Sequence, residues 1–231
     1  MPGPKLHLWI GYRVAEALPA HPVLGDLLLG TISPDAVHAR DEWSRRAKRH
    51  SHLVRKGEHI QRRFARYDAL WHRYQDTDEA DFAWGWISHL VADHLWSHLI
   101  GRAYWHRTVT DLPHDERRRI WYEELAAADS CIDLDRQELG RVLSALRSAE
   151  PRSFGDFMDA DVIGRWRDEV VRNWSEREVP AGYVATFFTP ARVRAYADVV
   201  LDTLIHCRSD GIRATYLWLA TNYPEDDLLK Y

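Results

Sequence analysis

Residues 86–94 read Trp-Ile-Ser-His-Leu-Val-Ala-Asp-His, and this stretch combines an apolar helical pattern with two kinds of metal-binding side chain. His89 and Asp93 are four residues apart, so a helix places them on the same face. Their neighbours are apolar, and a buried carboxylate is costly unless a cation or several hydrogen bonds compensate it. The stretch therefore predicts a buried helix that carries half of a metal site.

The rest of the chain shows the same helical periodicity, and the strict alternation typical of strands is scarce. We therefore expect an all-α helical bundle. The expected helices cover 6–18, 22–29, a short segment from 33, 53–74, 79–106, 113–128, 135–148, 153–174, 190–207 and 212–221. Because no repeat or long linker interrupts them, one domain over 1–231 is the simplest organisation, with the metal motifs in 1–110 and a helical remainder in 111–231.

Charge and cysteine content exclude several classes of protein. The 31 basic and 35 acidic residues give a net charge of −4, so no overall field indicates a stable nucleic-acid partner. Cys131 and Cys207 are isolated, which disfavours a thiolate site or a disulfide framework. No uncharged apolar stretch reaches the length of a membrane helix or a signal peptide core. We expect a cytoplasmic protein with reduced thiols, and the oligomeric state stays open.

Three upstream residues are candidates for the other half of the metal site. His7 lies in the first expected helix, and Asp35 follows Ser33 and Pro34, which read as an N-cap and a first helical residue. His52 lies where the helix over 53–74 is expected to begin. Zinc takes His nitrogen and carboxylate oxygen, and helical bundles build such sites from side chains on several helices.

Each of these candidates also has an ordinary alternative. A histidine such as His7 can donate to a backbone carbonyl, and Asp35 can be a first-turn acid that the helix dipole favours. His52 can be a solvated cap residue. The residues alone leave these alternatives open.

Four segments in order carry a family resemblance: Lys5-Leu-His-Leu8, Gly30-Thr-Ile-Ser-Pro-Asp-Ala-Val-His38, Ser51-His-Leu53 and Gly85-Trp-Ile-Ser-His-Leu-Val-Ala-Asp93. Over roughly its first hundred residues the chain resembles the zinc-dependent phospholipase C family, most of all its intracellular branch. That family shares its all-helical fold with the zinc-dependent single-strand nucleases. The resemblance therefore implies the same helical fold here.

The resemblance also implies a set of ligands. Asp35, His52, His89 and Asp93 would bind one ion, and His7 would help to hold a neighbouring ion that Asp93 bridges. The N-terminal Trp and other residues of a trinuclear site have no counterpart here, so we expect one or two zinc ions, with other divalent metals as alternatives. Two further histidines are possible contributors, His38 as a ligand or phosphate-orienting donor and His98 as a ligand.

These features together predict a zinc-dependent phosphoric ester hydrolase that acts on a phosphoester or phosphodiester through a metal-activated water. Asp35 or Asp93 would orient that water or accept its proton. A basic run could clamp the phosphate, although a solvated surface is its ordinary role; its members are Arg40, Arg45, Arg46 and Lys48. The substrate could be a small phosphoester, a phospholipid headgroup or a nucleotide.

Two rival interpretations stay open. An HD-type phosphohydrolase is also all-α, but the only adjacent His-Asp pair is His114-Asp115, in a charged segment that suits an exposed helix start. The second rival is a catalytically inactive or metal-stabilised helical binding protein with the same fold. A coordination position open to solvent would favour hydrolysis, and a closed one would favour a structural metal.

Overall fold

Helices form most of the computed structural model, which describes residues 2–101, 111–130, 134–174 and 183–222. The elements are α1 (Pro4–Ala17), α2 (Leu24–Ile32), the 3₁₀ helix η1 (Ser33–Ala39), α3 (Arg45–Ser51), α4 (Ile60–Tyr74), α5 (Ala80–Leu95), the π-helical turn η2 (Trp96–Gly101), α6 (His114–Ser130), α7 (Arg136–Ser148), α8 (Ala160–Asn173), α9 (Pro190–Ser209) and α10 (Ile212–Asn222). Within the described ranges there is no strand, which confirms the all-α prediction.

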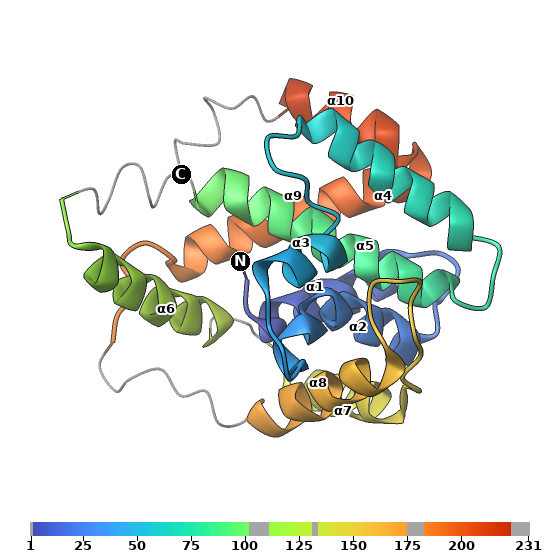
Figure 1. The fold of residues 1–231 in the computed structure, drawn as a ribbon, viewed down its shortest axis with the longest axis horizontal. Helices are drawn as coiled ribbons and strands as arrows, with labels where there is room; N and C mark the ends of the chain where they lie inside the picture. Colours follow the sequence, from blue (N-terminus) through green and yellow to red (C-terminus); the bar gives the residue numbers. More distant parts are fainter. Residues whose placement is uncertain (1, 102–110, 131–133, 175–182, 223–231) are drawn as a thin grey trace.

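Helix α5 runs through the middle of the bundle, with α4 and α10 on one side and α1 and α2 on the other (Figure 1). It packs most closely against α2, because Gly30 and Gly85 allow the two backbones to touch. A Cβ atom on Gly30 would collide with the carbonyl of Phe82, and one on Gly85 would collide with the carbonyl of Leu27. This close crossing fixes the start of η1 beside the face of α5 that carries the candidate ligands.

The segment before Asp35 differs from the prediction. Ser33 does not cap a new helix, because η1 continues directly from α2 and Ile32 occupies the N-cap position. The Ser33 hydroxyl instead donates to the carbonyl of Leu29 at 2.7 Å. The buried hydroxyl therefore already has a hydrogen-bond partner in the preceding turn, and it does not accept from a backbone N–H of η1 as an N-cap would.

The basic segment before His52 is helical, although no helix is among those expected there. Residues 45–51 form α3, whose first turn is capped by Ser44, since its Oγ accepts from the backbone N–H of Ala47 at 3.1 Å. His52 ends this helix, and Leu53 follows with a φ of 52°. The prediction that His52 begins a helix over 53–74 is therefore wrong, since α4 begins only at Ile60.

Other elements follow the expected ranges with two further differences. The helix expected from 153 begins at Ala160, because Phe154 and Met158 close a turn in which the Phe154 N–H donates to the Met158 carbonyl at 2.9 Å. The helix expected over 79–106 ends as an α-helix at Leu95, and its last residues lie outside the described ranges. None of the described helices has both the length and the apolar character needed to cross a membrane.

Candidate metal centre

Five buried ligand-type side chains from four elements meet beside α5. They are His7 on α1, Asp35 on η1, His52 at the end of α3, and His89 and Asp93 on α5. Each is at most 8% exposed. The structure therefore brings together all five residues that the sequence predicts as metal ligands.

Hydrogen bonds through Ser51 hold the end of α3 against its neighbours. The Trp86 indole N–H donates to the Ser51 carbonyl at 3.1 Å, and the Ser51 hydroxyl donates to the Pro34 carbonyl at 2.9 Å. One bond reaches α5 and the other reaches η1, so His52 is set between the two elements that carry the other ligands. The buried Trp86 thus acts as a polar anchor as well as a core residue.

The closest ligand atoms surround the Nε2 atom of His52. This atom lies 3.3 Å from Asp35 Oδ1, 3.3 Å from Asp93 Oδ2 and 3.2 Å from the Nε2 atom of His89. Asp93 Oδ2 lies 3.7 Å from His89 Nε2. Tetrahedral zinc with bonds of about 2.0–2.1 Å separates its ligands by about 3.3 Å. The ligand atoms of Asp35, His52 and His89 all lie within 4.8 Å of one another, which suits one ligand set. Those of His7, His89 and Asp93 form a second such group, and Asp93 Oδ2 lies beside the first.

Backbone carbonyls orient two of the histidines. His89 Nδ1 lies 2.9 Å from the Thr31 carbonyl, and His52 Nδ1 lies 2.9 Å from the Lys48 carbonyl. Because a carbonyl only accepts, each Nδ1 carries the proton and each Nε2 of a neutral ring presents a lone pair. Two such lone pairs facing one another are satisfied by a shared cation, and this arrangement of the outer nitrogen is typical of metal-bound histidine.

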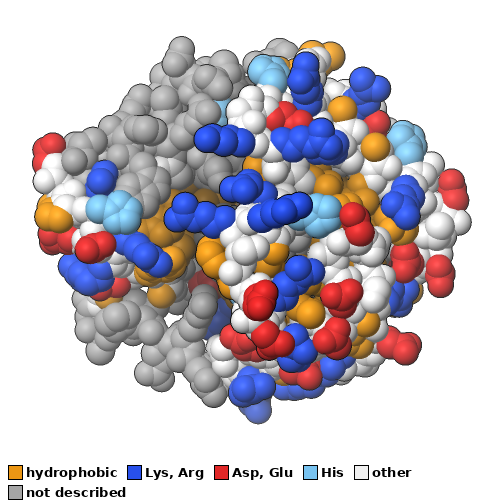
Figure 2. Space-filling model, in the orientation of Figure 1, with side chains coloured by type: hydrophobic (Ala, Val, Ile, Leu, Met, Phe, Trp, Pro, Cys, Tyr) orange, Lys and Arg blue, Asp and Glu red, His pale blue; other side chains and the backbone are white. Residues whose placement is uncertain are grey.

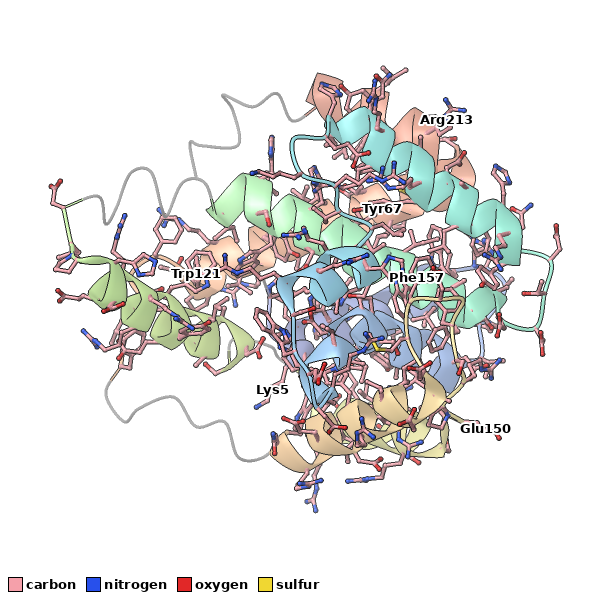
Figure 3. All side chains as sticks on the ribbon, in the orientation of Figure 1. Lys5, Tyr67, Trp121, Glu150, Phe157 and Arg213 are labelled. Atoms are coloured by element: carbon pink, nitrogen blue, oxygen red, sulfur yellow. The ribbon has the colours of Figure 1, made fainter. Side chains whose placement is uncertain are left out.

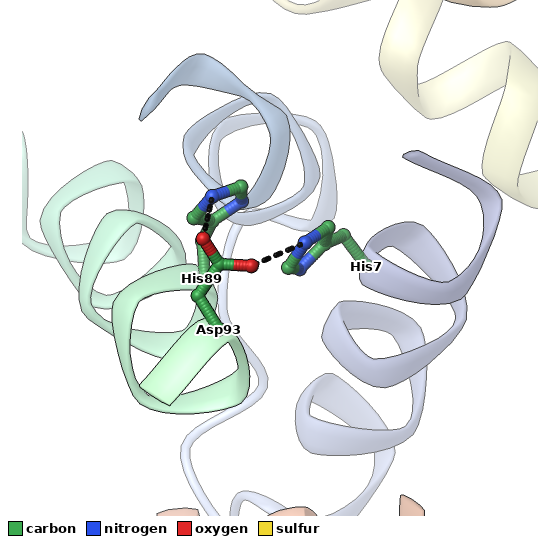
Figure 4. Close-up of side chains that lie close together, drawn as sticks. All are labelled: His7, His89 and Asp93. Atoms are coloured by element: carbon green, nitrogen blue, oxygen red, sulfur yellow. Dashed lines mark ion pairs between the residues drawn. The ribbon is translucent and has the colours of Figure 1, made fainter. Parts of the chain in front are cut away.

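His7 occupies the other side of Asp93 (Figure 4). Its Nε2 lies 3.5 Å from Asp93 Oδ1, and its ring stacks on that of His89 with 3.9 Å between the centroids. Neither ring nitrogen of His7 has a hydrogen-bond partner, and neither has Asp93 Oδ1. Buried polar atoms are rarely left unpaired, so these atoms fit a second ion beside the first. The two oxygens of Asp93 thus face different groups of histidines.

The charges of the cluster also suit a cation. Burial by itself raises the pKa of Asp35 and Asp93. His52 and Lys48 outweigh burial at Asp35, and His89 and His52 outweigh it at Asp93, so both pKa values lie well below the ordinary range. Burial and the nearby His7 lower the pKa of His89 to about 3. Burial lowers the pKa of His52, yet the two carboxylates raise it to about 9, so without a metal this ring is protonated at neutral pH and its Nε2–H faces them. A metal ion at this position would take the place of that proton and leave the ring neutral. Two ionised carboxylates and a neutral His89 give a donor set that zinc accepts.

A cavity of about 350 Å³ reaches the cluster at His52 and Asp93. Its other lining residues include the cations Lys48, Arg49 and Arg63. Of the four basic residues expected near the phosphate, only Lys48 lines this cavity. Arg40 donates to the Phe157 carbonyl, and Arg45 and Arg46 are exposed elsewhere.

Sequence reasoning missed Arg49 and Arg63. Arg49 could have been found by recognising α3, because Ser44 followed by strong helix formers is a capped helix start. Arg63 comes from α4 and lies 3.1 Å from His94 Nδ1. No local pattern links Arg63 to the metal residues, because their proximity depends on the packing of α4 against α5.

The remaining candidate histidines lie outside the cluster. His38 is exposed, with its Nε2 3.0 Å from Lys48 Nζ and 3.9 Å from Asp35 Oδ1. The ring of His98 stacks on that of His94 and belongs to neither group of converging ligand atoms. His114 and Asp115 are largely exposed at the start of α6, as a solvated helix start would be.

Of three comparisons with known proteins, one found a match. A search of curated proteins and a search of solved structures found no match. The family model described as zinc dependent phospholipase C matches residues 6–134, which is more than half of the chain and contains all five converging residues. This chain therefore belongs to the zinc-dependent phospholipase C family, as the order of its motifs indicates.

Proposed function

We propose that this protein is a zinc-dependent hydrolase of phosphoesters or phosphodiesters. The observation that carries the proposal is the convergence of His52, His89, Asp35 and Asp93 beside a cavity that is open to two of them. These four residues would hold one ion, and His7 with Asp93 Oδ1 would help to hold another. The open side of the cluster favours hydrolysis over a purely structural metal.

Zinc, when bound, lowers the pKa of a water ligand toward about 7 and offsets the negative charge of a phosphate. The chain supplies the rest. Asp35 and Asp93 are ionised, so an oxygen of either can accept a hydrogen bond from the attacking water and orient it. Their depressed pKa values make them weak proton acceptors, so orientation is the role that their charge supports best. Lys48 holds Asp35 with Nζ 3.0 Å from Oδ1 and also lines the cavity, which suits it to position that carboxylate and to face the phosphate.

Three cations around the cavity indicate an anionic substrate. Lys48, Arg49 and Arg63 line the space beside His52 and Asp93, whereas Leu90, Val54 and Tyr67 give part of its wall an apolar character. Phosphate oxygens bind such cations strongly because the hydrogen bonds are charge-assisted. A phosphoester with a modest apolar or aromatic group fits this lining. Phospholipid headgroups, nucleotides and small phosphoesters all meet that description.

Hydrolysis of simple substrates tests the proposal. Purified protein, supplied with zinc, is assayed with bis(p-nitrophenyl) phosphate, p-nitrophenyl phosphate and a short-chain phosphatidylcholine. We expect turnover of at least one of them and its loss after chelation. Lys48→Met should lower kcat/KM about 100-fold, because a cation that stabilises developing charge is removed.

A matched control is available on an exposed surface. Lys56→Met removes one exposed positive charge outside the cavity and should leave kcat/KM unchanged. A protein that binds zinc at the cluster yet hydrolyses none of the substrates would overturn the proposal and favour a metal-stabilised binding protein. Equal losses in the two lysine variants would show that Lys48 acts through general charge alone.

A further inference from the structure

A second and larger cavity lies next to the one at the metal centre. Its volume is about 660 Å³, and Arg49 and Val54 line both cavities. The lining of the second cavity is strongly basic; its charged and titratable members are Arg40, Arg46, Arg49, His50, Arg55, Arg66 and Asp156. We call it the basic cavity.

Much of the positive charge of the basic cavity is uncompensated. No acidic residue in the described part of the chain pairs with Arg46, Arg49 or Arg55. Arg66, in contrast, forms an ion pair with Glu58. Asp156 is the cavity's acidic lining residue, and it lies 3.4 Å from His50.

The sequence concentrates this charge locally. Residues 40–66 contain ten Lys or Arg and only three Asp or Glu, although the whole chain has more acidic than basic residues. Figure 2 shows the Lys and Arg side chains gathered over this part of the surface. Such a concentration beside low-dielectric walls focuses a positive potential that attracts anions.

The cavity has an apolar wall as well as cations. Leu53, Val54 and Phe157 line it, and Phe157 lies beside α3 (Figure 3). The Phe157 ring lies 5.2 Å from that of His50. A site with several unpaired guanidinium groups over apolar carbon suits a ligand that carries phosphate on an organic framework.

We propose that the basic cavity binds a second phosphate of the substrate, one that is not hydrolysed. Arg46 and Arg55 would contact this phosphate, and Arg49 would lie between it and the reacting phosphate at the metal centre. The proposal rests on the proposed function for the reacting group. It narrows the substrate class to phosphoesters that carry another phosphate a short distance away.

Matched substrate pairs test this proposal and distinguish its two sources of phosphate. One pair is a dithymidine phosphodiester with and without a 5′-phosphate. The other is a soluble short-chain phosphatidylinositol with and without a phosphate on the inositol ring. We expect the doubly phosphorylated member of one pair to have a kcat/KM higher by about tenfold, and Arg46→Gln or Arg55→Gln to abolish that preference.

Two controls isolate the site. Lys56→Gln removes one exposed charge next to Arg55 but does not line the cavity, so it should keep the preference. Activity on bis(p-nitrophenyl) phosphate, which has no second phosphate, should be unchanged in both arginine variants. A preference absent from both pairs, or lost equally in Lys56→Gln, would overturn the proposal.

A binding measurement keeps the proposal testable even if hydrolysis fails. A pyrene trisulfonate dye, whose sulfonates are weak metal ligands, is titrated with the full-length protein and followed by fluorescence anisotropy at low salt. We expect Arg46→Gln and Arg55→Gln to raise the Kd about fivefold or more, with Lys56→Gln close to the wild type. Equal Kd values in all four proteins would overturn the second anion site, whatever the hydrolysis assay shows.

Discussion

Asp93 makes contacts that no other residue of the centre makes, because its two oxygens face different histidines. Oδ2 lies 3.3 Å from His52 Nε2, and Oδ1 lies 3.5 Å from His7 Nε2. A carboxylate in this position can bridge two ions. Asp35 contacts His52 and Lys48, and it does not belong to the group of ligand atoms that contains His7. Loss of Asp93 should therefore disturb both groups of ligands.

Replacement of the histidines outside the cluster, in contrast to loss of Asp93, should leave zinc binding unchanged. His38→Ala and His98→Ala should retain the zinc content of the wild type, because neither ring joins the converging ligand atoms. His38→Ala should lower activity only modestly, since it removes a contact to Lys48. Metal analysis of the purified variants checks this. Loss of zinc from either one would place that histidine among the ligands.

Sequence patterns predicted which residues converge beside α5 better than they predicted what surrounds those residues. The spacing of His89 and Asp93 on one helical face is local information, so it could be predicted. The carbonyl of Thr31, which orients His89, could not, because any residue offers a carbonyl and only packing brings it within 2.9 Å. Arg63 could not be predicted either, because it lines the cavity from α4 and only packing brings it there.

At the scale of elements, the crossing of α2 and α5 sets the position of the centre. Gly30 and Gly85 are needed there because the opposite backbone occupies the space of a side chain. Gly85→Ala should lower the free energy of unfolding by about 1–3 kcal/mol, because the added Cβ would collide with the carbonyl of Leu27 and push the two helices apart. Denaturant unfolding measures the change.

Gly140 in α7 provides the matched control for that substitution. A Cβ atom there would meet nothing within 4 Å, so Gly140→Ala should raise the stability by about 0.5–1 kcal/mol through helix propensity. A stabilising effect of Gly85→Ala would contradict the close contact between the backbones of α2 and α5.

Glu124 joins α6 to the segment before α9 and gives a prediction on pH. Its carboxylate is buried and accepts from the backbone N–H groups of Thr186, Phe187 and Phe188. Burial raises its pKa, but these donors outweigh burial and hold the pKa below the ordinary value of 4.5. The ionised form therefore stabilises the fold above pH 4.5, and that contribution is lost as the pH falls through the depressed pKa.

Glu124→Gln should cost about 1–3 kcal/mol at pH 7, because an amide NH₂ then faces N–H donors. The difference from wild type should shrink when urea unfolding is repeated below pH 4.5. Glu150→Gln is the control, since Glu150 is exposed and should show no such difference. A difference that grew on acidification would contradict the role given to Glu124.

Most helices could be predicted from periodicity, but several ends could not. α3 is almost entirely polar, so it lacks the apolar stripe that reveals a helix, and its stability comes from the Ser44 cap and from contacts at Ser51. The contacts of Glu124 lie about 60 residues along the chain. Interactions at such separations depend on the fold and leave no local pattern.

At the scale of the whole molecule, the centre links α1, η1, α3 and α5, so bound metal should stabilise the fold. If the protein is saturated at about 100 times the Kd, the gain is about 2.7 kcal/mol. For a chain of this size we expect chelation to lower the Tm by about 5–10 °C, and added zinc to restore it. Differential scanning calorimetry checks this, and an unchanged Tm would show that the metal does not join these elements. The assignment of the whole chain to one domain stays a prediction.

The most direct test of the centre is the zinc content of Asp93→Ala compared with the wild type, measured by mass spectrometry of metal in protein purified with added zinc. Circular dichroism and the milder Asp93→Asn variant show whether the fold is kept. The wild type should hold one or two zinc ions per chain, and both variants should lose zinc while His98→Ala keeps it. Undiminished zinc in a folded Asp93→Ala protein would contradict the centre described here.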